Sequence, residues 1–393
     1  MVIPLLAGVG PAAAQDSPAE VAEIPIAYVT QTVKELPPLS LVDQPTTDNG
    51  LLGARLGIED SNTTGRFTNQ HFTLDEAVVA EDGDVAAAFR ERHAKGERFF
   101  IIDLPAAQLL AIADLPEARD SLLFNVRAKD DALRNAQCRA NLLHTMPSHA
   151  MLADALAQYL MWKRWADWFL IVGTGDEDKL FAEAVRRAAE RFSATIVEER
   201  VFDAAPGARR TDTGHAQIQK QMPVVTQDAG DYDVLVVADF RDAFGEYLPY
   251  RTWDPRPVVG TQGLVPTAWH RSQEQWGATQ MQNRFTRFAG RWMTERDYAA
   301  WVAVRSISEA TTRTSKTDRA SVDAYIRGAD FGAAGFKGQK LTYREWDGQL
   351  RQPILLATTR TLVSVSPQEG YLHEFSELDT LGYDRPDSGC EFR

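Results

Sequence analysis

Short apolar runs alternate with amphipathic helical patterns along most of this chain. Phe99–Asp103, FFIID, is almost continuously apolar, as in a strand buried on both faces of a parallel sheet, and residues 104–113 then follow helical spacing. Such alternation predicts βαβ units in a doubly wound α/β sheet. The predicted strands are residues 24–30, 71–80, 99–103, 121–126, 168–173, 193–202, 233–238 and 257–261, and the predicted helices are residues 50–62, 83–96, 104–113, 130–143, 150–164, 177–192 and 216–221.

The alternation pauses once, at residues 144–149 (HTMPSH), before a second strand-helix series begins. Two similar halves are therefore expected. Three helices are predicted after them, at residues 274–293, 297–311 and 318–328. The tail returns to strands at residues 340–346, 349–358 and 361–365, and the Asp347-Gly348 pair between the first two is a strong hairpin signal.

Composition supports a large globular protein. The 393 residues are 44% hydrophobic, enough for two buried cores. The formal charge is −13 and no polybasic block occurs, so we expect no general attraction to nucleic acid or to anionic membranes. Residues 241–327 are different, with thirteen Lys or Arg against nine Asp or Glu. This local excess indicates either an anionic small ligand or ordinary surface variation.

The N-terminus, MVIPLLAGVGPAAAQ, has the apolar run and small residues of a secretory signal peptide, with cleavage expected after Ala14. Residues 1–14 are therefore interpreted as a signal peptide remnant. No later run approaches the roughly 18 apolar residues of a membrane span. We expect an exported, soluble, periplasmic protein. In that oxidising compartment Cys138 and Cys390 fit one disulfide, although two separate thiols remain an alternative.

The stretch from Phe244 to Gly277 is rich in aromatic and basic side chains among prolines and glycines, which predicts loop around one short strand. Each Trp alone could be a hydrophobic plug. Together, aromatic faces and guanidinium groups favour a cleft that stacks on a flat ligand and pairs with its acid groups. The expected contacts in this stretch are Arg251, Trp253, Arg256, Trp269, His270 and Trp276.

Ligands of open α/β sheets bind beyond the carboxyl ends of the strands. That rule selects a second group of residues, each of which could instead be a helix cap or a surface residue. His144 is added because it lies where the chain passes between the halves, as a ligand contact or as a satisfied hinge histidine. The selected residues are Asp103, Asn125, Arg127, Thr174, Asp239, Phe240, Arg241 and Gln262.

Catalytic motifs are missing from the sequence. Gly173-Thr-Gly175 lacks the third glycine of a dinucleotide fingerprint, and the acids that follow it would repel a pyrophosphate. There is no G-x-S-x-G elbow, no H-E-x-x-H and no C-x-x-C. His144 and His149 lack the i, i+4 spacing of a metal pair on one helix face. We expect no enzyme, no catalytic cofactor and no metal site.

The order of these parts resembles the type I periplasmic substrate-binding proteins of ABC importers, the Leu/Ile/Val-binding group. The segments that carry the resemblance are GARLGIEDSNTTG, LLHTMPSHAMLADALAQYL, WFLIVGTGDEDKLFAEAVRRAAERF and DYDVLVVAD. It implies two Rossmann-like lobes with a ligand cleft between them, three chain crossings, a monomer and an ABC permease as partner. On that basis lobe 1 comprises residues 22–146 and 264–327, and lobe 2 residues 147–263 and 328–393.

A narrower similarity concerns FGEYLPYRTWDPRPVVGTQGL, AWHRSQEQWGA, DYAAWVAVR and WDGQLRQPILL. These segments resemble substrate-binding proteins associated with pyrroloquinoline quinone (PQQ)-dependent alcohol dehydrogenase systems. The loops IIDLPA and NVRAKDD lack the Ser and Thr residues with which amino-acid-binding members hold their ligand. The resemblance thus suggests PQQ, a flat tricarboxylate, as ligand. The alternatives are an amino-acid-type receptor, and a delivery or assembly partner of a PQQ-dependent dehydrogenase.

Overall fold

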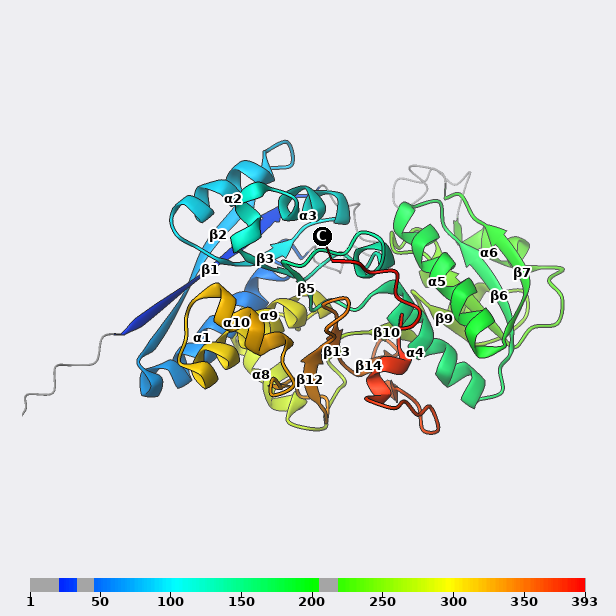
Figure 1. Cartoon of the computed structure of the whole chain (residues 1–393). Helices are drawn as coiled ribbons and strands as arrows, with labels where there is room; N and C mark the ends of the chain where they lie inside the picture. Colours follow the sequence, from blue (N-terminus) through cyan, green and yellow to red (C-terminus); the bar gives the residue numbers. More distant parts are fainter. Residues whose placement is uncertain (1–20, 34–45, 205–217, 393) are drawn as a thin grey trace, which may run out of the picture.

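The computed structural model describes residues 21–33, 46–204 and 218–392, so the predicted signal peptide remnant lies outside the described residues. Two lobes lie side by side, each built on a parallel sheet (Figure 1). The sheet of lobe 1 has the order β2-β1-β3-β4-β5. Its strands are β1 (Ala22–Gln31), β2 (Gln70–Val79), β3 (Phe99–Asp103), β4 (Leu122–Asn125) and β5 (Leu142–His144).

Helices cover both faces of this sheet, because alternate side chains of its strands point to opposite sides. Ile101 faces a core formed with α1 (Leu51–Thr68) and α9 (Glu295–Thr314), whereas Phe100 and Ile102 face a second core. The other helices of lobe 1 are α8 (Ala278–Ala289) and α10 (Arg319–Arg327) on the first face, and α2 (Val85–Ala94) and α3 (Ala106–Ala113) on the second.

Lobe 2 repeats the arrangement with a sheet of order β7-β6-β8-β9. The strands are β6 (Asp167–Val172), β7 (Thr195–Val201), β8 (Val234–Ala238) and β9 (Val258–Gly260). One face packs on α4 (His149–Trp162) and α5 (Asp176–Phe192), and the other on α6 (Ile218–Thr226) and α7 (Leu248–Arg251). The predicted α/β class with two Rossmann-like lobes is confirmed.

The crossing region contains two small antiparallel sheets. One consists of β10 (Val265–Thr267), β14 (Ile354–Ala357) and β15 (Leu362–Ser366), and the other of β11 (Ala333–Ala334), β12 (Lys340–Tyr343) and β13 (Leu350–Arg351). The predicted hairpin at Asp347-Gly348 joins β12 to β13.

The third crossing lies later in the chain than the sequence suggested. Phe331, Tyr343 and Leu350 pack in the core of lobe 1, whereas Ile354 and Leu356 pack in the core of lobe 2. The structure therefore moves this lobe boundary from residues 327/328 to the segment between β13 and β14.

The helix predicted over residues 130–143 is wrong. Only Asp131–Arg134 forms a short 3-10 helix, and the segment ends as strand β5. Arg134 explains the change, because its buried guanidinium donates to the side chain of Gln349 and to the carbonyl oxygens of Ala128, Asp130 and Met146. An irregular loop surrounds this cation more completely than an exposed helix face would.

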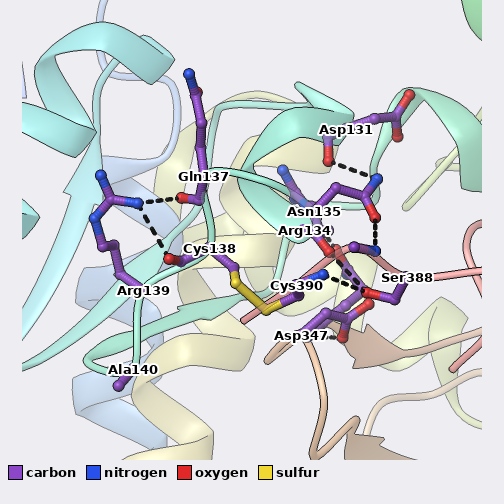
Figure 2. The surroundings of a disulfide bond; sticks show 12 residues. Asp131, Arg134, Asn135, Gln137, Cys138, Arg139, Ala140, Asp347, Ser388 and Cys390 are labelled. Atoms are coloured by element: carbon purple, nitrogen blue, oxygen red, sulfur yellow. Dashed lines mark hydrogen bonds between the residues drawn. A yellow bond between two sulfur atoms is a disulfide. The ribbon is translucent and has the colours of Figure 1, made fainter. Parts of the chain in front are cut away.

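The C-terminal segment returns from lobe 2 to lobe 1. Leu381 packs in the core of lobe 2, and Gly382 accepts hydrogen bonds from Arg187 and Arg191 of α5. Cys390 then forms the expected disulfide with Cys138, with their Cα atoms 5.7 Å apart, beside a hydrogen bond from Ser388 to the carbonyl of Arg134 (Figure 2). The tail is thus a covalent connection between the lobes, in addition to the three crossings.

Replacing both Cys138 and Cys390 with serine is expected to lower the free energy of unfolding by about 2–4 kcal/mol, since the bond closes a long loop of the unfolded chain. Urea unfolding with and without a reductant measures the effect. The double variant should no longer respond to the reductant, and a wild-type protein whose stability is equal in both conditions would contradict the prediction.

Candidate functional site

A cavity of about 230 Å³ lies between the lobes, at the carboxyl edge of the lobe 2 sheet. Lys129 and Glu295 reach it from lobe 1, and the crossing strand β10 forms one side. The remaining wall comes from lobe 2 and comprises Leu152, Phe181, Asp239, Phe240, Asp242, Gly260, Thr261 and Gln262. This position agrees with the rule that ligands bind beyond the carboxyl ends of parallel strands.

Lys129 and Glu295 form an ion pair at this cavity. Lys129 lies on the loop after β4, and Glu295 is the first residue of α9, where a carboxylate is favoured by the helix dipole. Thr267 of β10 also donates to Glu295, over 3.1 Å. Burial opposes ionisation of Glu295, but the charge of Lys129 and these hydrogen bonds hold the pKa of Glu295 below its usual value. The carboxyl group of Glu295 is therefore ionised at neutral pH.

The lobe 2 wall is fixed by its own hydrogen bonds. The Asp239 carboxylate accepts from the backbone N–H groups of Ala243, Phe244 and Gly245, over 2.7 to 3.0 Å. The Gln262 amide donates to the carbonyl of Asp239 and to the Asp242 carboxylate. These bonds determine the shape of the loop after β8 before any ligand arrives.

Phe240 is the aromatic part of the wall. Its backbone N–H donates to buried Asp178 at the start of α5, over 2.7 Å, which holds the residue in place. Its ring makes an edge contact with His149, and the ammonium group of Lys129 lies 5.1 Å from the ring centroid. Lys129 thus contacts lobe 2 through Phe240 while it pairs with Glu295 within lobe 1.

The ionisable groups lining the cavity are three carboxylates, those of Asp239, Asp242 and Glu295, and one ammonium, that of Lys129. The net charge of these groups is negative, which favours a ligand that carries positive charge. Lys129 can still pair with a ligand carboxylate, whereas a ligand with several acid groups meets repulsion. Over the described ranges, no three His, Cys, Asp or Glu side chains gather as a metal site.

Of the residues predicted around the cleft, Asp239, Phe240 and Gln262 line this cavity. Arg127 lies partly exposed on the loop that carries Lys129, and Arg241 is exposed directly after Phe240. His144 is buried between Asn125 and the crossing, with Nδ1 3.0 Å from the Asn125 amide nitrogen. Burial, together with the charge of Arg134, holds the pKa of His144 well below its usual value, which suits a neutral hinge histidine.

Three predicted contacts lie at the opposite edge of the lobe 2 sheet. Arg256 pairs over 2.8 Å with Asp231, which precedes β8, and the backbone of Trp253 donates to Thr226 at the end of α6. Arg251 is exposed at the end of α7. All three precede β9 and therefore lie at its amino end, while Thr261 and Gln262 follow β9 and reach the cavity.

The remaining predicted contacts lie on lobe 1 or on the crossing. Trp269 is buried in the lobe 1 core, stacked 4.8 Å from Tyr298. Ser272 shares a hydrogen bond of 2.6 Å with Nδ1 of half-buried His270. Trp276 is 65% exposed beside a different hollow, near Pro367. The structure does not gather the aromatic and basic stretch into one cleft.

Sequence reasoning missed Lys129 and Glu295 as site residues. Lys129 lies in a loop that the strand-end rule covers, so the rule locates the region without naming every member of the site. Glu295 lies two residues before the predicted start of its helix, and no local signal showed that this helix end faces the other lobe.

Three comparisons with known proteins bear on the fold. A family model described as periplasmic binding protein matches residues 42–361. The comparison with curated protein sequences gives no match.

No helix within the described ranges is long and apolar enough to cross a membrane.

Solved structures of low sequence identity share the whole architecture. A leucine-, isoleucine-, valine-, threonine- and alanine-binding protein from Brucella ovis, in a closed conformation, has a TM-score of 0.69 and 13% identity over 95% of this chain and 100% of that one. An ABC transporter substrate-binding protein from Sphaerobacter thermophilus has a TM-score of 0.69 and 16% identity over 88% and 98%. An amino acid ABC transporter substrate-binding protein from Pseudomonas fluorescens Pf-5 has a TM-score of 0.67 and 13% identity over 95% and 100%.

Proposed function

The chain belongs to the periplasmic binding protein family, and from that premise we propose that it captures a small zwitterion of the amino-acid type between its lobes. It then presents this ligand to the permease of an ABC importer. The observation that carries the ligand class is the cavity lining, in which three carboxylates meet one ammonium group. The role is binding and release rather than catalysis, and the family places it in the periplasm.

The charged groups that line the cavity predict how the ligand is oriented. Its carboxylate pairs with Lys129, and its ammonium group lies toward Glu295 and Asp242. Phe240 offers an apolar face to the ligand side chain. The volume of about 230 Å³ suits a ligand of amino-acid size. Amino-acid binders among the structural neighbours support this size class without identifying the ligand of this chain.

PQQ is the rival ligand, predicted from the narrower sequence resemblance. Its three carboxylates require several guanidinium groups, and the Arg residues expected to supply them, Arg251 and Arg256, lie at the far edge of the lobe 2 sheet. Among the described residues, Lys129 alone offers a cation at the cavity. The zwitterion is therefore favoured. The alternative role, as partner of a PQQ-dependent dehydrogenase, also depends on PQQ binding. It therefore stays a prediction, like PQQ binding itself.

Isothermal titration calorimetry with the standard amino acids and PQQ tests this proposal. We expect saturable binding of at least one amino acid and none of PQQ at micromolar concentration. Saturable binding of PQQ alone would reverse the ligand assignment while leaving the family assignment unchanged.

Replacing Lys129 with methionine is expected to weaken binding of that amino acid by about 10- to 100-fold, because a charge-assisted hydrogen bond is lost. Calorimetry measures the change. The matched control is Lys163→Met, since Lys163 lies at the end of α4 and outside the cavity lining. Equal affinity of the two variants would argue against Lys129 as the carboxylate partner.

A further inference from the structure

A second and larger hollow lies outside the cavity between the lobes. It is a groove of about 830 Å³, within the size range of small-molecule sites. Its walls are the β12–β13 hairpin, the end of α10 at Arg327, and the C-terminal segment from His373 to Pro386. Figure 1 shows the hairpin and this red segment near the centre of the molecule. None of its lining residues also lines the cavity between the lobes.

The groove is fixed in shape by buried ion pairs. Arg344 and Arg351 both pair with Asp379 over 2.8 Å, and Arg344 also donates to the carbonyl oxygens of Leu378 and Leu381. Both Arg344 and Asp379 are almost fully buried. These bonds attach the C-terminal wall to the hairpin, so the groove exists before any ligand binds.

Unused donors converge on this groove. Lys340 and Arg385 line it, and neither forms an ion pair with another described residue. Two buried nitrogen atoms of its lining, Arg327 Nη1 and Trp346 Nε1, have no hydrogen-bond partner within the described ranges. A buried donor without a partner is costly, and a ligand oxygen would relieve that cost.

The acids of the lining do not satisfy these donors. Asp384 is occupied by His373, 2.9 Å away. Glu345 and Glu374 are exposed, where water screens their charge. Lys340 and Arg385 are exposed as well, so the selectivity of this groove for an acid group depends mainly on the two buried donors.

Aromatic side chains supply the apolar surface of the groove. Trp346 has the guanidinium groups of Arg344 and Arg351 within 5.3 Å of its ring centroid, and Phe375 is 81% exposed. The combination of rings and unused donors selects a flat ligand with an acid group.

We propose that this groove is a second ligand site, which binds an aromatic carboxylate of small-molecule size. Lys340 pairs with the carboxylate, and Trp346 and Phe375 contact the ring. Lys340, at the start of β12, and Arg385, on the opposite wall, bring positive charge from two sides. The volume fits a small molecule, and the site does not depend on the ligand of the cavity between the lobes.

Calorimetric titration of the full chain with 2-naphthoate tests this proposal. We expect saturable binding at one site, about tenfold weaker in Lys340→Glu and unchanged in Lys340→Arg. Lys163→Glu is the control, because Lys163 lies outside the groove and 4.7 Å from the ring centroid of an exposed indole, that of Trp162. This control should bind like the wild type.

Three outcomes would overturn the second site. The first is the absence of saturable 2-naphthoate binding, and the second is equal affinity in Lys340→Glu and in the wild type. The third is loss of binding in Lys129→Met, which would place the probe in the cavity between the lobes. Unchanged binding in Lys129→Met, together with the loss in Lys340→Glu, supports the groove.

Discussion

Replacing Trp269 with alanine is expected to lower the free energy of unfolding by about 3–5 kcal/mol, while Trp253→Ala changes it little. Trp269 is 2% exposed, and its ring stacks on Tyr298 with an interplanar angle of 13°. Its indole N–H donates to the side chain of Gln282, which would lose a buried partner. Trp253, in contrast, is 60% exposed.

Urea unfolding of both variants measures this difference, and calorimetry measures their ligand affinity. A folded Trp269→Ala protein should bind its ligand like the wild type, because Trp269 packs in the core of lobe 1. The interpretation of Trp269 as packing would be wrong if the variant kept its stability and lost its ligand. That result would restore the stacking role that the sequence suggested.

Replacing Asp379 with alanine is also expected to cost about 3–5 kcal/mol of unfolding free energy, because it leaves a buried cation without its partner. Arg344 is 1% exposed and pairs with Asp379, which also binds Arg351. Asp379 lies on the C-terminal segment, and both arginines lie on or beside the hairpin. The loss therefore affects the joint between the hairpin and the C-terminal segment.

The matched control is Asp231→Ala, which removes the exposed partner of Arg256. Exposed ion pairs contribute little, so this variant should unfold like the wild type. Chemical denaturation compares the two variants. A similar small decrease in the free energy of unfolding in both variants would show that the Asp379 ion pairs stabilise the protein no more than a surface ion pair does.

Much of the fold follows from the sequence because buried strands of parallel sheets are short and strongly apolar. Phe99–Asp103 was predicted with its observed bounds, and residues 233–238 correspond to β8 within one residue. The hairpin at Asp347-Gly348 follows from local turn chemistry. Each of these signals is local, so no long-range contact is needed to interpret it.

The aromatic and basic stretch from Phe244 to Gly277 shows what local sequence signals do not predict, namely which edge of the sheet each side chain reaches. It was predicted to contain a strand at residues 257–261, and the structure confirms one as β9. Three residues of strand span about 10 Å, which separates Trp253 and Arg256 from the edge that Gln262 reaches. Residue types alone suggested one surface, whereas the strand between them divides the stretch between two edges of the sheet.

Two other features depend on partners far away in the sequence. The loop around Arg134 replaces the predicted helix because Gln349, 215 positions later, helps to bury its guanidinium. Lys129 becomes a site residue because Glu295 and Phe240 approach it from different elements. A hydrophobic pattern cannot encode such pairs, since it records which side chains are buried but not which charged groups meet.

We expect the two lobes to close on a ligand that is held by Lys129. Small-angle X-ray scattering of the wild-type protein, without and with a saturating amount of the amino acid found by calorimetry, tests it most directly. We expect a smaller radius of gyration with ligand, because hinge closure brings the lobes together. An unchanged radius of gyration at saturation would contradict capture between the lobes.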